Sequence, residues 1–417
     1  MSVLDLVRLE DIEKARDLLA GVVVRTPLEE SRPLTESLGV PTFLKCENQQ
    51  RAGSYKVRGA YNRISRLSEA ERSRGVVAAS AGNHAQGVAL AAGLVGTRAT
   101  VFMPEGAPLP KVTATKGYGA TIEYAGHSVD DALVAAKAFA ERTGAVLIHP
   151  FDHPDVIAGQ GTVGLEILDQ CPTVGTIITA VGGGGLVSGV AVAAKTLRPD
   201  IRVIGVQAAG AASYPPSLAA GSPQKLPASD TIADGIAVLR PGDLTFAHVS
   251  KLVDEIVTVT DDDLSAALLL LLERHKMVVE PAGAAAVAAL RTHRPDTPGP
   301  IVAILSGGNI DPMLLLKVIE HGLAAAGRFL RLSVRCGDQP GELAGVLTKI
   351  AQYRANVIDV EHSRQNPRLS FGQVEVFLSV ETRGPDHSKA LIGALRDSGY
   401  ELTMLPGQHP AARYQVP

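Results

Sequence analysis

The sequence predicts an α/β protein with mostly parallel sheets, followed by a smaller module of strands and helices. Short runs rich in β-branched residues alternate with alanine- and leucine-rich helical stretches through most of the 417 residues. Polar, glycine-rich turns follow several of these runs. The pattern changes after the small-residue stretch 321–327. At this length we expect two or three domains.

Residues 1–322 are expected to form two α/β subdomains. After an apolar run at Pro41–Leu44, the expected buried strands are Val76–Ala79, Thr100–Met103, Thr121–Tyr124, Ala145–Ile148, Thr176–Val181, Ile201–Val206 and Ile301–Leu305. A helix is expected over Asp130–Arg142, with Ser128 as a candidate N-cap and Gly144 as a stop signal. Strands that alternate with helices favour parallel sheets covered on both faces.

Residues 328–417 are expected to form a ferredoxin-like βαββαβ module after a linker at 323–327. The expected elements are strand Phe329–Val334, helix Pro340–Ala355, strand Val357–His362, strand Gln373–Val380, helix His387–Ser398 and strand Tyr400–Met404. Apolar and polar residues alternate in the first strand, so one face of this sheet is expected to be solvated.

Composition excludes several classes of function. The net charge of -3 and the pI near 6.4 do not indicate a nucleic-acid partner. Cys46, Cys171 and Cys336 are odd in number and widely spaced, which fits neither a disulfide framework nor a metal site and indicates a reducing, cytoplasmic location. No signal peptide is recognised, and the longest apolar run, Ala266–Leu272, is too short to span a membrane.

The strongest ligand-binding signal is Gly182-Gly183-Gly184-Gly185-Leu186, between an expected strand and a helical stretch through Lys195. Four glycines allow a tight turn that presents successive N–H groups, and the helix start adds a positive partial charge. Neither a nucleoside-triphosphate loop nor the dinucleotide fingerprint matches this spacing. A phosphate-binding loop is therefore favoured over a flexible turn.

Three further polar turns follow expected strands or begin helices. Ser80-Ala81-Gly82-Asn83-His84 offers a hydroxyl, an amide and N–H groups that suit a substrate carboxylate. His84 taken alone is interpreted as a packed or capping residue. Ser306 lies in a glycine-rich turn, and Glu280 precedes a proline at a helix start, where a cap is the simplest interpretation.

Lys56 lies in Ser54-Tyr55-Lys56-Val57-Arg58-Gly59-Ala60, at the start of an expected helix. Alone it would be interpreted as a surface lysine. Beside an aromatic ring, however, a held and partly neutral amine could form a Schiff base. An amine, a phosphate cradle and a carboxylate cradle together are what an amino acid needs to react on pyridoxal 5'-phosphate (PLP), which supplies an electron sink.

On these residues the chain resembles the fold type II PLP enzymes, which have two open α/β sheets of the tryptophan synthase β type, and among them the threonine ammonia-lyases. The resemblance covers roughly residues 12–323. The matching stretches are 47–48, 54–60, 80–87, 159–162, 182–186, 233–235, 280–284 and 306–309.

The resemblance implies a role for each matched position. Lys56 would form the Schiff base beside Tyr55 and remove the Cα proton. Asn83 would bond the 3'-oxygen of PLP, and Ser306 would face the pyridine nitrogen. The other residues expected to bind the cofactor are Gly182, Gly183, Gly184, Gly185, Leu186 and Glu280. The residues expected to hold the substrate carboxylate are Ser80, Gly82 and His84.

The implied reaction is elimination of water from L-threonine, followed by hydrolysis of the released aminocrotonate to 2-oxobutyrate and ammonia; L-serine would yield pyruvate. Serine racemases of this family carry a second serine where this chain has Ala81, and an alanine cannot protonate a carbanion. Elimination is therefore favoured over racemisation. An L-serine dehydratase or serine racemase is the alternative, and an amino-acid sensor without catalysis is a third possibility.

The C-terminal region resembles an ACT regulatory domain, whose Asp-x-Pro-Gly-x-Leu signature stands here as residues 338–343. Amino-acid effectors bind near this turn in that family, so Asp338 and Gly341 are the expected effector contacts. Structurally, Asp338 is also a good helix cap and Pro340 a good first helical residue. A homodimer or homotetramer is expected because ACT modules usually pair.

Overall fold

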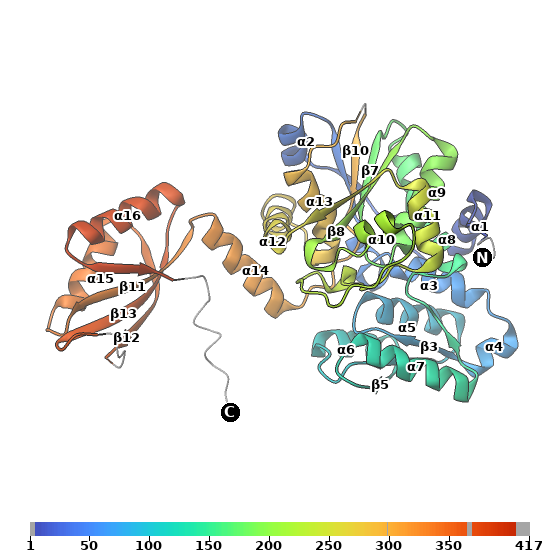
Figure 1. The fold of residues 1–417 in the computed structure, drawn as a ribbon, viewed down its shortest axis with the longest axis horizontal. Coiled ribbons are helices and arrows are strands. Elements are labelled where there is room, and N and C mark those ends of the chain that lie inside the picture. Colours follow the sequence, from blue (N-terminus) through green and yellow to red (C-terminus); the bar gives the residue numbers. More distant parts are fainter. Residues whose placement is uncertain (1–4, 298, 365–368, 406–417) are drawn as a thin grey trace. The chain divides into compact units, whose positions relative to one another are not determined.

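The computed structural model describes residues 5–297, 299–364 and 369–405 (Figure 1). The chain divides into two compact units, Met1–Asp311 (unit 1) and Pro312–Pro417 (unit 2). In the chain, the two units meet at Asp311 and Pro312. The sequence instead predicts a boundary after residue 322 and a linker at 323–327. Helix α14 (Pro312–Ala325) runs through most of that stretch, because its alanines and leucines are good helix formers. Part of each expected domain lies outside the described residues: 1–4 of the catalytic part, and 365–368 and 406–417 of the regulatory module.

The smaller sheet of unit 1 is parallel throughout. Its strands, in spatial order, are β5 (Thr121–Tyr124), β4 (Ala99–Met103), β3 (Val76–Ala79) and β6 (Val146–Leu147). Helix α5 (Asn83–Val95) follows β3 and α7 (Val129–Thr143) follows β5, and the chain moves across the sheet in opposite directions at these two connections. Because parallel crossovers are right-handed, α5 and α7 cover opposite faces (Figure 1).

The larger sheet of unit 1 is parallel except at one edge, where β1 and β2 are antiparallel. Its strands, in spatial order, are β1 (Leu28–Glu30), β2 (Thr42–Lys45), β10 (Ile301–Ile304), β7 (Thr176–Ala180), β8 (Arg202–Ala208) and β9 (Glu255–Val259). Every strand expected in unit 1 is present. The sequence did not predict three strands: β1, which is very short, β2, which was noted only as an apolar run, and β9, a half-exposed edge strand.

Helices cover both faces of the larger sheet as well. The remaining helices of unit 1 are α1 (Leu9–Leu19), α2 (Arg32–Leu38), α3 (Lys56–Ser65), α4 (Glu69–Arg74), α6 (Leu109–Gly117), α8 (Pro154–Gln170), α9 (Gly185–Leu197), α10 (Tyr214–Ala220), α11 (Asp243–Leu252), α12 (Asp261–Leu270) and α13 (Pro281–Thr292). The prediction for α7 is confirmed: Ser128 Oγ accepts the Asp131 N–H, and Gly144 ends the helix with a φ of 72°.

The carboxyl ends of the central strands carry the polar turns that the sequence analysis selected. Ser80 follows β3, the glycine run follows β7 and Ser306 follows β10. In open α/β sheets, ligands bind in the crevice outside these strand ends. The fold therefore places the turns where a binding site is expected.

Unit 2 contains the expected βαββαβ order in one antiparallel sheet. Besides α14, its elements are β11 (Phe329–Gly337), α15 (Glu342–Gln352), β12 (Asn356–Ser363), β13 (Gln373–Glu381), α16 (Pro385–Asp397) and β14 (Glu401–Met404). The sheet order β12-β13-β11-β14 is that of a ferredoxin-like fold. The second face of the sheet is not uniformly solvated, since Ser333 and Glu375 are buried there and Ser333 donates a hydrogen bond to Glu375.

The three cysteines are buried and free. Burial raises the pKa of the Cys46 thiol to about 12, so this thiol stays protonated and unreactive at neutral pH. Among the described residues, no helix is long and apolar enough to cross a membrane.

Candidate active site

Lys56 is the first residue of α3 and is partly buried. Its Nζ donates a hydrogen bond to the carbonyl of Pro150 at 2.8 Å and lies 5.3 Å from the centre of the Tyr55 ring. Burial lowers the pKa of Lys56 to about 8, although the charge of Glu280 opposes the shift. A substantial fraction of this amine is therefore neutral near physiological pH, as a nucleophile requires.

The segment before Lys56 is attached to the turn after β10. Ser54 forms an antiparallel bridge with Gly307, and the Tyr55 N–H donates to the carbonyl of Ser306 at 3.3 Å. Ser306 is buried, and its hydroxyl lies 3.5 Å from the carbonyl of Ala282. The structure thus brings Lys56 and Ser306, which are far apart in the sequence, to one place.

Asn83 and Glu280 contact each other directly. The Asn83 amide donates to the Glu280 carboxyl and accepts from Asn309 Nδ2 at 2.8 Å. Burial raises the pKa of Glu280, and the bond from Asn83 opposes this shift. Glu280 occupies the N-cap position of α13 but makes no capping bond with its side chain, so the cap interpretation is wrong.

The Ser80–His84 turn leads into α5. The Gly82 N–H donates to Ser80 Oγ at 3.1 Å, and His84 Nε2 lies 2.8 Å from the carbonyl of Ile148. Burial, together with the charge of Lys56, lowers the pKa of His84 to about 3, so the imidazole is neutral. Because Nε2 must carry the proton given to that carbonyl, Nδ1 can only accept. His84 can therefore offer a donor to a carboxylate only through its main-chain N–H.

The glycine run from Gly182 to Gly185 has no room for side chains. A Cβ at Gly183 would lie 2.3 Å from the Phe151 ring, and one at Gly184 would lie 2.0 Å from the Tyr214 hydroxyl. Gly184 also has a φ of 98°, which favours glycine. Within the described part of the chain, the N–H groups of Gly182, Gly183 and Gly184 donate to no other residue. They form, with the start of α9, a cradle that suits an anion.

The sequence analysis missed the turn after β6. Pro150 accepts the bond from Lys56, the Phe151 ring packs on Gly183 while its Cβ and main chain lie against Gly185, and Asp152 accepts the N–H groups of Asp243 and Thr245. This turn follows a strand and is polar, which is the same signal that identified the other turns.

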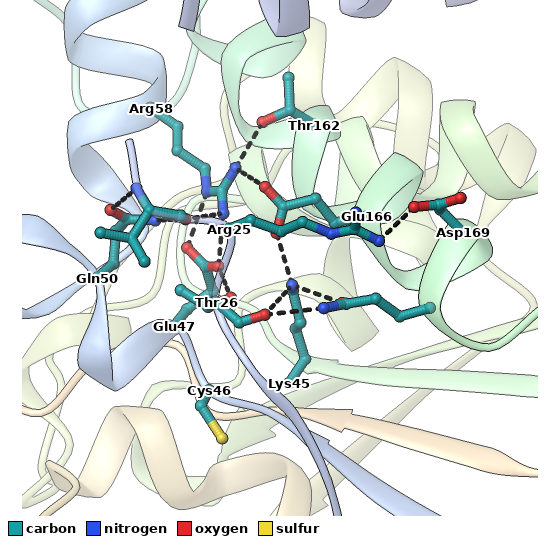
Figure 2. Close-up of polar contacts among 12 residues, drawn as sticks. Arg25, Thr26, Lys45, Cys46, Glu47, Gln50, Arg58, Thr162, Glu166 and Asp169 are labelled. Carbon is teal, nitrogen blue, oxygen red and sulfur yellow. Dashed lines mark hydrogen bonds and ion pairs between the residues drawn. The ribbon is translucent and has the colours of Figure 1, made fainter. Parts of the chain in front are cut away.

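Arg58, on the same helix as Lys56, belongs to a cluster of charges from several elements (Figure 2). Arg58 donates to Glu47 at 2.8 and 2.9 Å and to Glu166 at 2.7 Å, and Lys45 Nζ lies 2.6 Å from the other oxygen of Glu166. Burial alone would raise the pKa of Glu47, but the charge and hydrogen bonds of Arg58 outweigh it and lower that pKa. We call Lys45, Glu47, Arg58 and Glu166 the ion cluster. It ties β2, α3 and α8 together.

The two expected effector residues belong to unit 2. The Asp338 carboxylate accepts two hydrogen bonds from Arg364, at 2.9 and 3.0 Å, and this pairing lowers the pKa of Asp338. Asp338 does not cap α15. Gly341 occupies the N-cap position with a φ of 98°, so the helix begins at Glu342 instead of Pro340.

Comparison with known proteins gives a consistent result. The family model described as "Pyridoxal-phosphate dependent enzyme" matches residues 19–307. The L-threonine ammonia-lyase of Geobacter sulfurreducens is 46% identical over 395 residues, which are 94% of this chain and 98% of that protein.

Solved structures agree in fold. A threonine deaminase from Solanum lycopersicum, in its processed form, has a TM-score of 0.70 and 39% identity, and the match covers 77% of this chain and 91% of that one. Maize serine racemase has a TM-score of 0.72 and 40% identity, with 77% and 99% covered. The family model alone spans more than half of the chain. This chain therefore belongs to the pyridoxal-phosphate dependent enzyme family, in its fold type II form.

Proposed function

We propose that this chain is an L-threonine ammonia-lyase that converts L-threonine to 2-oxobutyrate and ammonia and also accepts L-serine. The observation that carries the proposal is the buried, partly neutral amine of Lys56 beside a glycine cradle for an anion. The extent of the similarity to the Geobacter sulfurreducens enzyme supports it further, because that match includes most of unit 2 as well as unit 1.

The residues present fit PLP. The glycine cradle, with its free N–H groups and excluded side chains, suits the phosphate, and Lys56 supplies the amine. Asn83 and Ser306 offer neutral polar groups for the ring. When bound, PLP supplies the electron sink that stabilises negative charge at the substrate Cα.

Each of the chain's own groups has a task in elimination. The Lys56 amine takes the proton from Cα, and the resulting ammonium returns a proton to the β-hydroxyl, which leaves as water. The main-chain N–H groups at the start of α5 hold the substrate carboxylate, while the neutral His84 ring is held by Ile148. Ser306 contributes a hydroxyl and no charge, which weakens the electron sink and favours elimination over a long-lived carbanion. The proposal therefore needs one base, Lys56.

A product assay tests this function. The purified holoenzyme is given L-threonine or L-serine, and 2-oxobutyrate, pyruvate and D-serine are measured. We expect 2-oxobutyrate to form fastest and D-serine not to form. D-serine formation faster than pyruvate formation would instead support serine racemase, which the likeness to the maize structure keeps as the second candidate.

For unit 2 we propose an effector-responsive ACT role in a cytoplasmic homodimer or homotetramer. The ferredoxin-like sheet order and the Asp338–Arg364 pair near Gly341 support this proposal. The test uses the full chain, whose threonine deamination is measured with added isoleucine, valine and other amino acids, and again in Asp338→Asn. Equal rates with and without every amino acid would refute regulation. Light scattering would give the oligomeric state.

A further inference from the structure

The carbonyl oxygen of Gly183 accepts hydrogen bonds from two buried hydroxyl groups. Thr245 Oγ1 lies 2.6 Å from this oxygen and Tyr214 Oη lies 3.2 Å from it. The Thr245 hydroxyl also lies 3.3 Å from the carbonyl of Gly242, but the shorter contact is the better hydrogen bond for its single proton. Both side chains come from outside the glycine run, from α11 and α10.

Holding this carbonyl fixes the direction of a neighbouring N–H. The peptide between Gly183 and Gly184 is trans and planar, so its N–H, on Gly184, points away from the carbonyl. The carbonyl faces Thr245 and Tyr214, and the Gly184 N–H therefore faces the opposite side. That N–H has no acceptor among the described residues.

We infer that Thr245 and Tyr214 are positioning residues for phosphate binding, because their hydroxyls hold the Gly183–Gly184 peptide with its N–H directed at the phosphate of PLP. The inference rests on the PLP-dependent function proposed above. It adds two residues, distant in sequence from the glycine run, that act through the main chain of that run.

The main chain at both Thr245 and Tyr214 is itself held in place by hydrogen bonds. The Asp152 carboxylate accepts the Thr245 N–H at 3.0 Å and the Asp243 N–H at 3.1 Å, at the start of α11, where a negative charge is favourable. The Tyr214 N–H donates to Gln207 Oε1 at 2.8 Å. Such support limits the freedom of the two hydroxyls, so the Gly183 carbonyl has one preferred direction.

The turn after β6, which contains Asp152, also contacts the Lys56 amine. Asp152 supports Thr245, Phe151 packs against Gly183 and Gly185, and Pro150 accepts the bond from Lys56. Three consecutive residues thus connect the phosphate cradle to the amine. This turn therefore links the position of the glycine run to that of the Lys56 amine.

The experiment compares cofactor affinities of the full-length apoprotein. Equilibrium dissociation constants are measured for PLP and for pyridoxal, which lacks the phosphate, in the parent protein and in Thr245→Val, Thr245→Ser and Tyr214→Phe. We expect PLP binding to weaken about tenfold in Thr245→Val and about threefold in Tyr214→Phe. Thr245→Ser, which keeps the hydroxyl, is expected to retain parental affinity. Pyridoxal binding is expected to change in none of them.

Two results would overturn the inference. One is unchanged PLP affinity in both Thr245→Val and Tyr214→Phe. The other is an equal loss of PLP and pyridoxal affinity, which indicates a distorted site instead of a misdirected N–H. If Thr245→Val does not fold, Tyr214→Phe decides alone because it removes a single oxygen. Deamination is assayed separately, so a protein that shows these affinities but forms no 2-oxobutyrate would refute the proposed function and leave this inference standing.

Discussion

Two cationic side chains near the start of α3 have opposite surroundings. Lys56 donates to a neutral carbonyl and makes no salt bridge with any described residue. Arg58, two positions later, contacts the carboxylates of Glu47 and Glu166 (Figure 2). Burial without a paired carboxylate lowers the pKa of Lys56 to about 8, whereas the carboxylates raise the pKa of Arg58 above its usual value despite burial.

Within one turn of α3, Lys56 is suited to react, whereas Arg58 is suited to stabilise the fold. A lysine can lose its proton when it is buried, while a guanidinium stays charged and binds carboxylates with two donors. The amine that we propose as the reacting group is therefore left without a counterion. The ion cluster beside it holds α3 against β2 and α8. This contrast leads to four predictions, in order of decreasing size.

Replacing Lys56 by alanine is expected to affect chemistry and not folding. The variant loses both the nucleophile and the base, so threonine deamination should fall by more than about 10⁴-fold. Its unfolding midpoint in urea should change little from that of the parent apoprotein, because no ion pair is broken and only the hydrogen bond to Pro150, worth about 1 kcal/mol, is lost. Deamination is followed as 2-oxobutyrate release. A variant that keeps a tenth of the activity would show that Lys56 is not the reacting amine.

Glu47→Gln is expected to lower the free energy of unfolding, the property that Lys56→Ala should leave nearly unchanged. It leaves the buried Arg58 with one carboxylate instead of two, and removing a partner from a buried pair costs about 3 kcal/mol. Urea unfolding of the apoprotein measures this loss. The matched control is Glu36→Gln, which removes an exposed partner of Arg32 and should leave the midpoint unchanged. Equal midpoints for Glu47→Gln and the parent would mean that the ion cluster does not support the fold.

Thr26→Val tests a smaller part of the ion cluster. Thr26 is buried, and its hydroxyl donates to Glu47 Oε1 at 2.6 Å. Loss of a hydrogen bond to a charged group costs about 2 kcal/mol. Thr26→Ser keeps the donor and should recover much of the stability in the same unfolding assay. A valine variant as stable as the parent would show that the hydrogen bond contributes nothing, because valine keeps the methyl group of threonine and removes only the hydroxyl.

These two regions also differ in how far the sequence predicts them. The glycine run between a strand and a helix is a local signal. Lys56 alone would be interpreted as a surface lysine, and the glycine run and the polar turns elsewhere in the sequence identify it. Their catalytic roles stay predictions, but the fold that carries them is confirmed.

The ion cluster has no comparable local signal. Lys45, Glu47, Arg58 and Glu166 come from different elements, and each alone would be interpreted as a solvated charge. Only the tertiary fold pairs them. The prediction that Asp338 caps a helix is wrong for a related reason. The sequence shows a residue suited to a cap, but it does not show that Arg364 pairs with Asp338 or that Gly341 takes the left-handed N-cap position.

The pH dependence of cofactor capture is the smallest effect and tests the reactive amine alone. Schiff-base formation needs the neutral amine, and the lowered pKa of Lys56 makes this form available at lower pH. The rate at which apoprotein captures PLP should therefore rise about tenfold from pH 7 to pH 9 and level off above the pKa near 8. Growth of the visible absorbance of bound PLP measures this rate. Glu280→Gln should move the midpoint to lower pH, because the Glu280 charge now opposes the shift. A rate that still rises steeply at about pH 10 would mean that Lys56 keeps the pKa of an exposed lysine, and the contrast with Arg58 would then lie only in their partners.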